Sequence, residues 1–257
     1  MPAHDLALLT DAARAAGKIA LRFWRNTPQV WDKADTSPVT EADLAVNDML
    51  HTRLMAARPG YGWLSEETPD DNARLDCEHV FIIDPIDGTR AFIAGEKHFS
   101  HSLAVARNGV ITAAVVFVPA LDHLYAATAD GPAMMNGAAL TASTKALHDH
   151  PNILMSKATL AADHWIGPPP DLQRSFRASI AYRLALVADG SFDAMLSFRA
   201  SWEWDIAAGS LIAARAGAKL CDSRGDPLQF NTPSAKLPGI YAGSAALFAD
   251  LAPRMNA

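Results

Sequence analysis

Cysteine is scarce in this sequence, and its scarcity removes two classes of protein. Only two of the 257 residues are cysteines, Cys77 and Cys221. They lie far apart and form no C-x-x-C spacing, so the sequence predicts neither a disulfide framework nor a zinc knuckle. Two isolated thiols are typical of a reducing compartment, and we expect a cytoplasmic protein.

Positive charge is also in short supply. The chain has 22 lysines and arginines against 28 aspartates and glutamates, which gives a formal net charge of −6. Such a chain has no broad basic field for a nucleic acid polymer. A small phosphorylated metabolite remains compatible with it, provided that bound divalent cations offset the like sign of protein and ligand.

Long apolar runs are missing as well. The most apolar stretch, 103–121, is broken by Arg107, Asn108 and Gly109, whereas a membrane-spanning helix needs about 20 consecutive apolar residues. The first ten residues contain Asp5 and lack a basic start followed by an apolar block, which argues against a secretory signal. Half of all residues are nevertheless apolar, enough to bury a core in one large domain or two packed lobes.

Apolar periodicity predicts a mixture of helices and strands. Asn108-Gly109 lies between two apolar runs within 102–118, which indicates a hairpin. Thr40 and Asp43 fit a variant capping box at the start of a helix. The predicted helices are 6–25, 41–57, 179–188 and 205–216, and the further strands are 62–65, 79–83, 123–128, 194–198 and a strand-turn unit at 219–230.

One change of composition suggests two lobes. Between 146 and 170 the chain becomes rich in histidine, proline and polar residues, and Pro168-Pro169-Pro170 punctuates it. We expect an N-terminal metal-binding lobe at 1–145 and a C-terminal lobe at 146–257 that completes the active site.

The most informative motif is the acidic turn at 84–89. Asp84-Pro85-Ile86-Asp87-Gly88-Thr89 follows the apolar run 80–83 directly. Two carboxylates three residues apart offer the hard oxygen ligands that Mg²⁺ prefers, and the amides of such a turn can hold phosphate. A single Asp-Gly pair is more often an ordinary surface turn, so the motif has to be weighed with others.

Three other acidic segments accompany that turn. An apolar stretch ends in Glu66-Glu67, and Glu66 could reach a cation held by Asp84. Trp204-Asp205 opens the predicted helix 205–216, where Asp205 by itself is read as the N-cap. The third segment, 33–43, is polar and rich in turn-forming residues, and it leads into the helix that begins at about Glu41.

Together and in this order, the four segments resemble one family, the Mg²⁺-dependent, lithium-sensitive phosphomonoesterases of the inositol monophosphatase superfamily. The resemblance spans nearly the whole chain, and coincidence of separate ordered motifs is far more specific than one motif alone. It implies an α/β (α+β) fold, a layered α-β-α-β-α sandwich of the inositol monophosphatase and fructose-1,6-bisphosphatase type. A homodimer is common among relatives. The signature positions are Glu66, Asp84, Ile86, Asp87, Gly88, Thr89 and Asp205.

The resemblance also implies roles for these residues around two or three Mg²⁺ ions. Glu66, Asp84 and the Ile86 carbonyl would hold one ion, and Asp84, Asp87 and Asp205 another. Glu66 and Thr89 would position the attacking water, with Asp43 placed among the catalytic residues. Gly88, Thr89 and Asp205 would bind the phosphate and the rest of the substrate. Lys33 and Thr40 would support the metal site without binding the metal themselves.

The substrate is less clearly indicated. Inositol monophosphatases place a hydroxyl-binding glutamate seven residues before the aspartate that corresponds to Asp205, and Phe198 stands there in this chain. Segments 33–43, 65–67 and 225–228 are similar to bacterial 3′(2′),5′-bisphosphate nucleotidases. We therefore expect a nucleotidase-like activity as the first choice. Arg90-Ala91-Phe92 looks more like the histidinol-phosphatase branch.

Alternatives therefore stay open: an inositol-1-phosphate or histidinol-phosphate phosphatase, or a non-catalytic protein that binds metal and phosphate. Arg183 and Arg199 are candidate contacts for a second phosphate or a base. His98 and His101 are expected to bind nothing, since no further ligand pattern joins them. Trp202 and Trp204 are expected to be packing residues.

Overall fold

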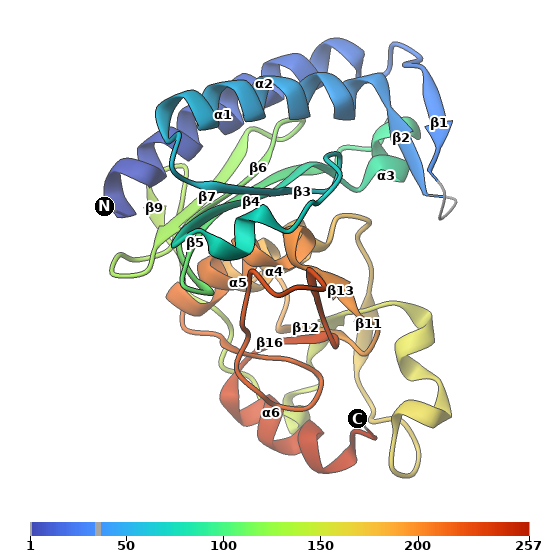
Figure 1. Ribbon diagram of the computed structural model, residues 1–257. Helices are drawn as coiled ribbons and strands as arrows, with labels where there is room; N and C mark the ends of the chain where they lie inside the picture. Colours follow the sequence, from blue (N-terminus) through green and yellow to red (C-terminus); the bar gives the residue numbers. More distant parts are fainter. Residues whose placement is uncertain (1, 34–36, 257) are drawn as a thin grey trace.

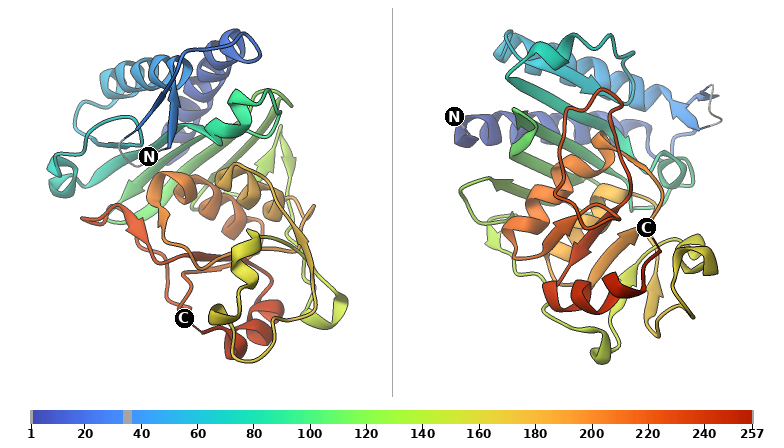
Figure 2. Two further views of the ribbon diagram at one scale, coloured as in Figure 1. Left: turned by 90° about the vertical axis from the view of Figure 1, so that its right-hand side faces the viewer. Right: turned by 60° about the horizontal axis from the view of Figure 1, so that its bottom comes forward.

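The computed structural model describes residues 2–33 and 37–256. Two β-sheets alternate with three layers of helices, which is the predicted α-β-α-β-α order (Figure 1). Views from two further directions show the same stacking (Figure 2). None of the helices in these two ranges is long and apolar enough to span a membrane.

The first layer consists of α1 (Pro2–Phe23) and α2 (Glu41–Ala57), which cover the outer face of a seven-stranded sheet. Leu9 of α1 and Leu50 of α2 are fully buried against it. The first two strands of the sheet are parallel and the others antiparallel. In spatial order they are β3 (Gly62–Ser65), β4 (His79–Asp87), β5 (Ser100–Arg107), β6 (Val110–Val118), β7 (His123–Thr128), β8 (Met134–Met135) and β9 (Ala138–Ala139).

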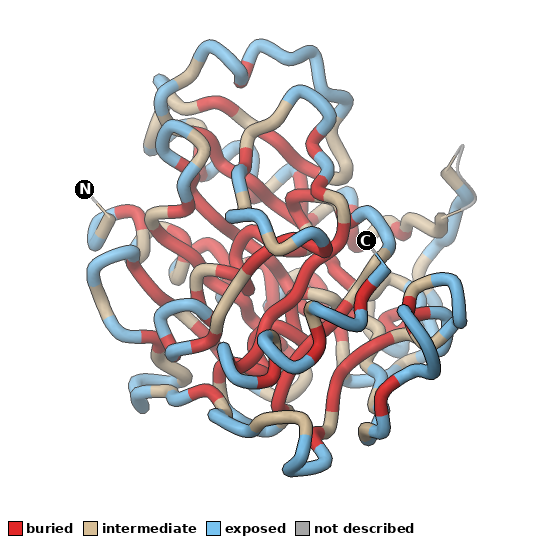
Figure 3. The backbone as a smooth tube through the Cα atoms, turned by 90° about the horizontal axis from the view of Figure 1, so that it is seen from below, coloured by how far each residue is buried: buried red, intermediate tan, exposed pale blue. Residues whose placement is uncertain are grey.

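The middle layer lies between the two sheets. It consists of α4 (Ile180–Ala188) and α5 (Glu203–Arg215), which pack closely because Gly209 of α5 faces Leu184. A Cβ on Gly209 would come within 2.5 Å of the Leu184 Cβ. One hydrophobic core therefore runs from the inner face of the first sheet through α4 and α5 to the second sheet. Figure 3 shows this buried interior surrounded by exposed loops.

The second sheet has five strands, and α6 (Ala245–Leu251) covers its far side. Two short antiparallel pairs lie outside both sheets: β1 (Val30–Asp32) with β2 (Pro38–Thr40), and β13 (Ser201–Trp202) with β15 (Lys236–Leu237). In spatial order the five strands are β11 (Gln173–Ser175), β10 (Asn152–Leu154), β12 (Ala194–Ser197), β16 (Ile240–Gly243) and β14 (Lys219–Cys221). The remaining helices are α3 (Thr89–Ile93) and the 3-10 turns Ala73–Asp76, Leu147–Asp149, Lys157–Leu160, Ala162–His164 and Ala252–Arg254.

The elements predicted from periodicity are largely confirmed. The hairpin turns at Asn108 and Gly109, whose φ angles of 49° and 80° suit a two-residue turn. Thr40 and Asp43 form the expected capping box. The first helix begins earlier and ends earlier than predicted, at Pro2 and Phe23.

Two predicted boundaries near the acidic residues, and one near the C-terminus, were wrong. Asp205 is not an N-cap: α5 begins two residues earlier, Trp202 is its cap residue, and Asp205 lies in the first turn. The strand predicted to end at Ile83 continues to Asp87, because an irregularity in the strand pairing accommodates the acidic turn within β4. Of the strand-turn unit 219–230, only Lys219–Cys221 is strand.

Candidate metal centre

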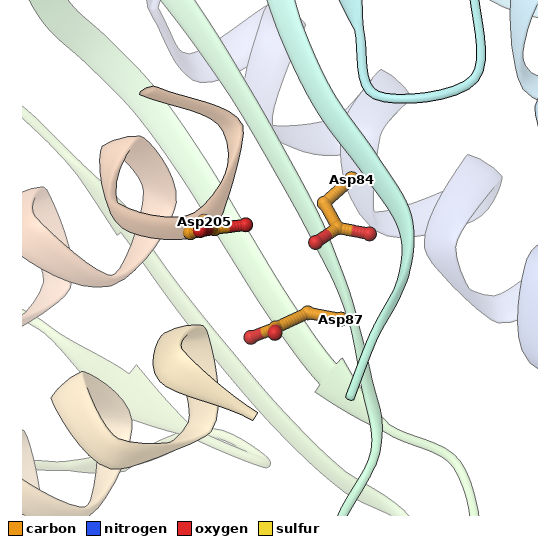
Figure 4. Close-up of side chains that lie close together, drawn as sticks. All are labelled: Asp84, Asp87 and Asp205. Carbon is orange, nitrogen blue, oxygen red and sulfur yellow. The ribbon is translucent and has the colours of Figure 1, made fainter. Parts of the chain in front are cut away.

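Three aspartates from two parts of the chain meet at the end of β4. Asp84 and Asp87 come from β4 and Asp205 from the first turn of α5, and a carboxylate oxygen of each lies within 4.8 Å of the others. Figure 4 shows the three side chains pointing toward one another. The sequence predicted all three as ligands of one metal ion, and the structure brings them together.

A β-bulge explains how residues three apart can share one site. In a regular strand, side chains at i and i+3 point to opposite faces. Here Asp84 pairs with Ser102 and Asp87 with Ser100, so Pro85 and Ile86 together stand opposite the single residue His101. The extra residue turns the strand locally, which lets both carboxylates face the same side.

Asp84 is the most deeply buried of the three. Its side chain is enclosed, with a relative exposure of 1%, and its Oδ1 has no hydrogen-bond partner among the described residues. Burial, and then the negative charges of Glu66, Asp87 and Asp205, raise its pKa well above the usual value. The pKa of Asp205 is raised as well, by burial and by Asp87 and Glu66. Such a cluster cannot be fully ionised without a compensating cation.

Asp87 is held by the beginning of α4. Its Oδ2 accepts hydrogen bonds from the Ser179 hydroxyl at 2.7 Å and from the Ala181 amide at 2.6 Å. Burial raises the pKa of Asp87 to about 6, although these hydrogen bonds and the charge of Arg183 oppose the rise. One carboxylate oxygen is thus fixed by the protein, which orients the side chain toward the other two aspartates.

Gly88 and Thr89 form the turn into α3. Gly88 has φ +91°, and a Cβ there would lie 3.2 Å from the Ser179 nitrogen and 3.3 Å from the His98 carbonyl, so glycine fits both the backbone and the space. The Thr89 hydroxyl lies 3.1 Å from the Ile86 carbonyl and 3.4 Å from Asp43 Oδ1. Thr89 therefore joins the bulge to α2.

Asp43 lies behind Thr89 and is fully buried. Its Oδ2 accepts hydrogen bonds from the Thr40 amide at 2.9 Å and the Thr40 hydroxyl at 2.5 Å, while its Oδ1 faces Thr89. Burial raises the pKa of Asp43 to about 6 against the effect of those two hydrogen bonds. Thr40 thus orients Asp43, and Asp43 in turn orients Thr89.

Glu66 follows β3, the neighbour of β4, and lies beside the cluster rather than within it. Lys33 Nζ is 2.8 Å from Glu66 Oε1 and 2.6 Å from Glu67 Oε1. Burial alone would lower the pKa of Lys33, but the two glutamates raise it. Burial and the charge of Glu66 raise the pKa of Glu67 to about 7. The ammonium group of Lys33 therefore pairs with both glutamates at this edge of the site. The next residues of the predicted segment 33–43, residues 34–36, lie outside the described residues.

Other residues named from the sequence lie near the cluster without joining it. Arg183 is only 7% exposed; its guanidinium donates to the Arg177 and Ala178 carbonyls and stacks on Phe176 at 4.4 Å. It supports the loop before α4, which the sequence did not indicate. Trp202 and Trp204 stack on each other at 4.5 Å, as expected of packing residues.

Comparison with known proteins shows which family has this fold and site. The model of the inositol monophosphatase family matches residues 2–252. The chain belongs to the inositol monophosphatase family. It is a phosphoric monoester hydrolase, and the site described above carries the acidic positions expected of a family that is generally Mg²⁺-dependent. The alternative of a non-catalytic binding protein is not supported.

Curated relatives within the family carry several different names. An inositol-1-monophosphatase of Rhizobium meliloti is 35% identical over 237 residues, covering 86% of each chain. A histidinol-phosphatase of Chlorobaculum parvum is 32% identical over 230 residues, again covering 86% of each. The 3′(2′),5′-bisphosphate nucleotidase CysQ of Escherichia coli K12 is 30% identical over 224 residues, covering 85% of this chain and 90% of that protein.

A solved structure agrees with the fold. The extragenic suppressor protein suhB of Bartonella henselae superposes with a TM-score of 0.83 at 26% identity, covering 97% of both chains. The layered family fold and the phosphatase activity are therefore shown. Since the three named relatives have similar identities, the comparisons leave the substrate undecided.

Proposed function

We propose that this enzyme is a Mg²⁺-dependent phosphatase that hydrolyses a small phosphate monoester by direct attack of water, and that its preferred substrate is a 3′(2′),5′-bisphosphate nucleotide. The observation that carries the metal dependence is the cluster of Asp84, Asp87 and Asp205, with oxygens within 4.8 Å of one another and one buried oxygen that no described group satisfies. Hard carboxylate oxygens are the donor set that Mg²⁺ prefers.

The position of one ion is supported by the cluster of Asp84, Asp87 and Asp205, and the ligands of a second ion are those that the family resemblance implies. Asp84, Asp87 and Asp205 would hold one ion, and Glu66, Asp84 and the Ile86 carbonyl another. When bound, Mg²⁺ would neutralise charge on the phosphoryl oxygens and lower the pKa of a nearby water. No phosphorylated enzyme is required by this arrangement.

The chain itself would orient the water. If the Thr89 hydroxyl donates its hydrogen to Asp43 Oδ1, 3.4 Å away, its oxygen lone pairs are free to accept a hydrogen from the attacking water. Asp43 keeps this direction because Thr40 occupies its other oxygen. Glu66, held by Lys33 at 2.8 Å, would act as the second orienting carboxylate. The amides of Gly88 and Thr89 would donate hydrogen bonds to the phosphate oxygens.

The preference for a nucleotide over inositol is supported by the identity of Phe198, which stands where the family resemblance expects a hydroxyl-binding glutamate. This side chain lies between β12 and β13, stacks on His164 at 4.7 Å and meets Trp165 edge-on at 5.6 Å. A phenylalanine offers no carboxylate to accept hydrogen bonds from a polyol, which disfavours inositol as the preferred substrate. Arg199 follows directly, and its charge acts on Asp205. Inositol-1-phosphate and histidinol phosphate are the alternative substrates.

The test is phosphate release with Mg²⁺ from adenosine 3′,5′-bisphosphate, inositol-1-phosphate and histidinol phosphate, with Asp84→Asn as the control protein. We expect the highest kcat/KM for the bisphosphate and no release above background by the variant. A preference for either alternative would reassign the substrate, and release by Asp84→Asn at a normal rate would refute the metal site.

Two further properties belong to this proposal. We propose that Li⁺ inhibits the reaction and that the enzyme is a homodimer, as the family resemblance implies. Inhibition is measured as the loss of phosphate release with rising LiCl against a KCl control. The mass of the particle follows from light scattering on a sizing column, and a monomeric mass at assay concentration would contradict the dimer.

A further inference from the structure

Three consecutive polar residues lie buried opposite the metal-binding bulge. Ser100, His101 and Ser102 open strand β5, and each has a relative exposure of 0%. A buried polar side chain costs free energy unless it finds a hydrogen-bond partner. Each of the three finds its partner in a different segment that carries or holds a metal ligand.

His101 contacts the bulge itself. It is the single residue of β5 that faces Pro85 and Ile86, and its Nδ1 lies within hydrogen-bond distance of the Pro85 carbonyl. Because the ladder is interrupted there, this carbonyl receives its hydrogen from a side chain. Burial lowers the pKa of His101 to about 4, so the ring is neutral near pH 7 and Nδ1 carries the donated hydrogen. Its Nε2 has no partner among the described residues.

Ser100 reaches Asp87 through a second serine. Its hydroxyl is 2.9 Å from that of Ser179, and Ser179 donates to Asp87 Oδ2 at 2.7 Å while accepting from the Tyr182 amide at 2.9 Å. Ser179 has only one hydroxyl hydrogen to give. With that hydrogen on Asp87, Ser100 is the donor to Ser179, so the bonds run from Ser100 to Ser179 to Asp87.

Ser102 holds the segment that carries Asp205. Its hydroxyl donates to the Trp204 carbonyl at 2.8 Å, one residue before Asp205. Because side chains alternate along a strand, His101 lies on one face of β5 and the two serines lie on the other. Leu103 and Val105, on the face of His101, belong to the core beneath α1 and α2. Ala104 and Ala106, on the face of the serines, belong to the core against α4 and α5.

We propose that Ser100-His101-Ser102 is a positioning element that holds the β4 bulge, the start of α4 and the first turn of α5 at the spacing needed for metal binding. Without a cation, the three aspartates repel one another and favour a wider spacing. One strand tied to all three segments opposes that widening, which lowers the cost of organising the site when Mg²⁺ binds. The inference rests on the proposed metal site and extends it to residues that touch neither metal nor substrate.

The experiment measures Mg²⁺ binding by calorimetry to metal-free protein without substrate. His101→Leu removes the donor, His101→Asn keeps an amide donor near the position of Nδ1, and Ser102→Ala removes the tie to Trp204. Ser210→Ala is the matched control, since this buried serine of α5 likewise donates to a backbone carbonyl, that of Ala207 at 2.9 Å. Circular dichroism and thermal unfolding establish that each variant is folded.

We expect His101→Leu and Ser102→Ala to weaken Mg²⁺ binding by about 10-fold or more, the usual scale for groups that orient metal ligands. His101→Asn should stay within about 3-fold of the wild type, and Ser210→Ala should bind Mg²⁺ normally even if its Tm falls. Should His101→Leu not fold, Ser102→Ala against Ser210→Ala decides the question.

Unchanged Mg²⁺ affinity in folded His101→Leu or Ser102→Ala would overturn the proposal, as would equal losses in the Leu and Asn variants. A wild-type protein that binds Mg²⁺ but hydrolyses no phosphate ester would instead contradict the proposed function and leave the positioning role intact. The two failures are therefore distinguishable.

Discussion

Asp84 and Phe198 differ in how firmly the surrounding structure fixes them. Asp84 lies on a central strand with β3 on one side and β5 on the other, and its exposure is 1%. Phe198 lies in a partly exposed segment between β12 and β13, where its main contacts are the rings of His164 and Trp165. The acidic cluster is thus fixed by buried, charged and hydrogen-bonded groups, whereas Phe198, the position that the family resemblance associates with the leaving group, is held by aromatic and other apolar contacts.

This difference explains why the reaction is easier to assign than the substrate. Changing a buried ligand carboxylate alters either the charge or the position of the oxygens at the metal site, so few residue types fit there. A partly exposed position such as 198 tolerates many residue types, so its identity constrains the substrate less. The comparison predicts large and uniform effects on the metal side and smaller, substrate-dependent effects at Phe198.

The largest effect is expected from Asp84→Asn. Loss of one ligand charge should reduce kcat by more than about 1,000-fold for every substrate, since both proposed metal positions use Asp84. The metal-free variant should also be more stable than the metal-free wild type, on the order of 1 kcal/mol or a few degrees in Tm, because repulsion with Glu66, Asp87 and Asp205 is relieved. Steady-state kinetics and calorimetric melting check both parts. A metal-free variant less stable than wild type would show that this repulsion does not dominate.

Thr89→Val should have the next largest effect. It removes the hydroxyl that lies 3.4 Å from Asp43 and 3.1 Å from the Ile86 carbonyl, while its shape is kept. We expect kcat to fall by about 100-fold with little change in KM, the scale of a positioned proton-transfer group. Thr89→Ser should retain most of the activity. Equal losses in the Val and Ser variants would indicate a packing role instead.

Stability should respond to pH and Mg²⁺ together. Burial raises the pKa values of Asp43 and Asp87 to about 6, so the native metal-free protein binds more protons than the unfolded chain between about pH 4 and pH 6. This stability is present at low pH and is lost as the pH rises through about 6. Mg²⁺ requires the ionised ligands, so the increase in Tm caused by Mg²⁺ should grow from about pH 5 to about pH 7.5. An increase that is flat or shrinks over this range would contradict the assignment of the cluster.

The smallest effect is expected at the leaving-group side. Phe198→Glu supplies the hydroxyl acceptor that the family resemblance associates with inositol, so the ratio of kcat/KM for inositol-1-phosphate to that for adenosine 3′,5′-bisphosphate should rise by about 10-fold. Phe198→Leu, which adds no acceptor, should leave this ratio nearer to the wild-type value. Parallel changes for both substrates would mean that residue 198 does not contact the leaving group.

The sequence predicted the ligands better than the means by which they are held. Asp84, Asp87 and Asp205 could be named together because the four acidic segments, in their order along the chain, resemble one family. The bulge could not be foreseen, since it depends on pairing with β5, and the predicted strand therefore stopped too early. Asp205 was read as a helix cap because caps are common, while α5 begins at Glu203.

Ser100-His101-Ser102 shows the limit of reading a sequence locally. His101 was expected to bind no metal, because no cysteine or further histidine joins the pair His98 and His101 in a ligand pattern. Its partner is a backbone carbonyl on the neighbouring strand, and the partners of the two serines are Ser179 and Trp204, far along the chain. Contacts between segments that are distant in sequence leave no local pattern, whereas the hairpin at Asn108-Gly109 does.

The central claim is that the acidic cluster binds the Mg²⁺ used in phosphate ester hydrolysis. Its most direct test is the initial rate of phosphate release from adenosine 3′,5′-bisphosphate in Mg²⁺, after addition of excess chelator, and after Mg²⁺ is restored. The account predicts a rate that falls to background with chelator and returns with Mg²⁺. Full activity in excess chelator would contradict it.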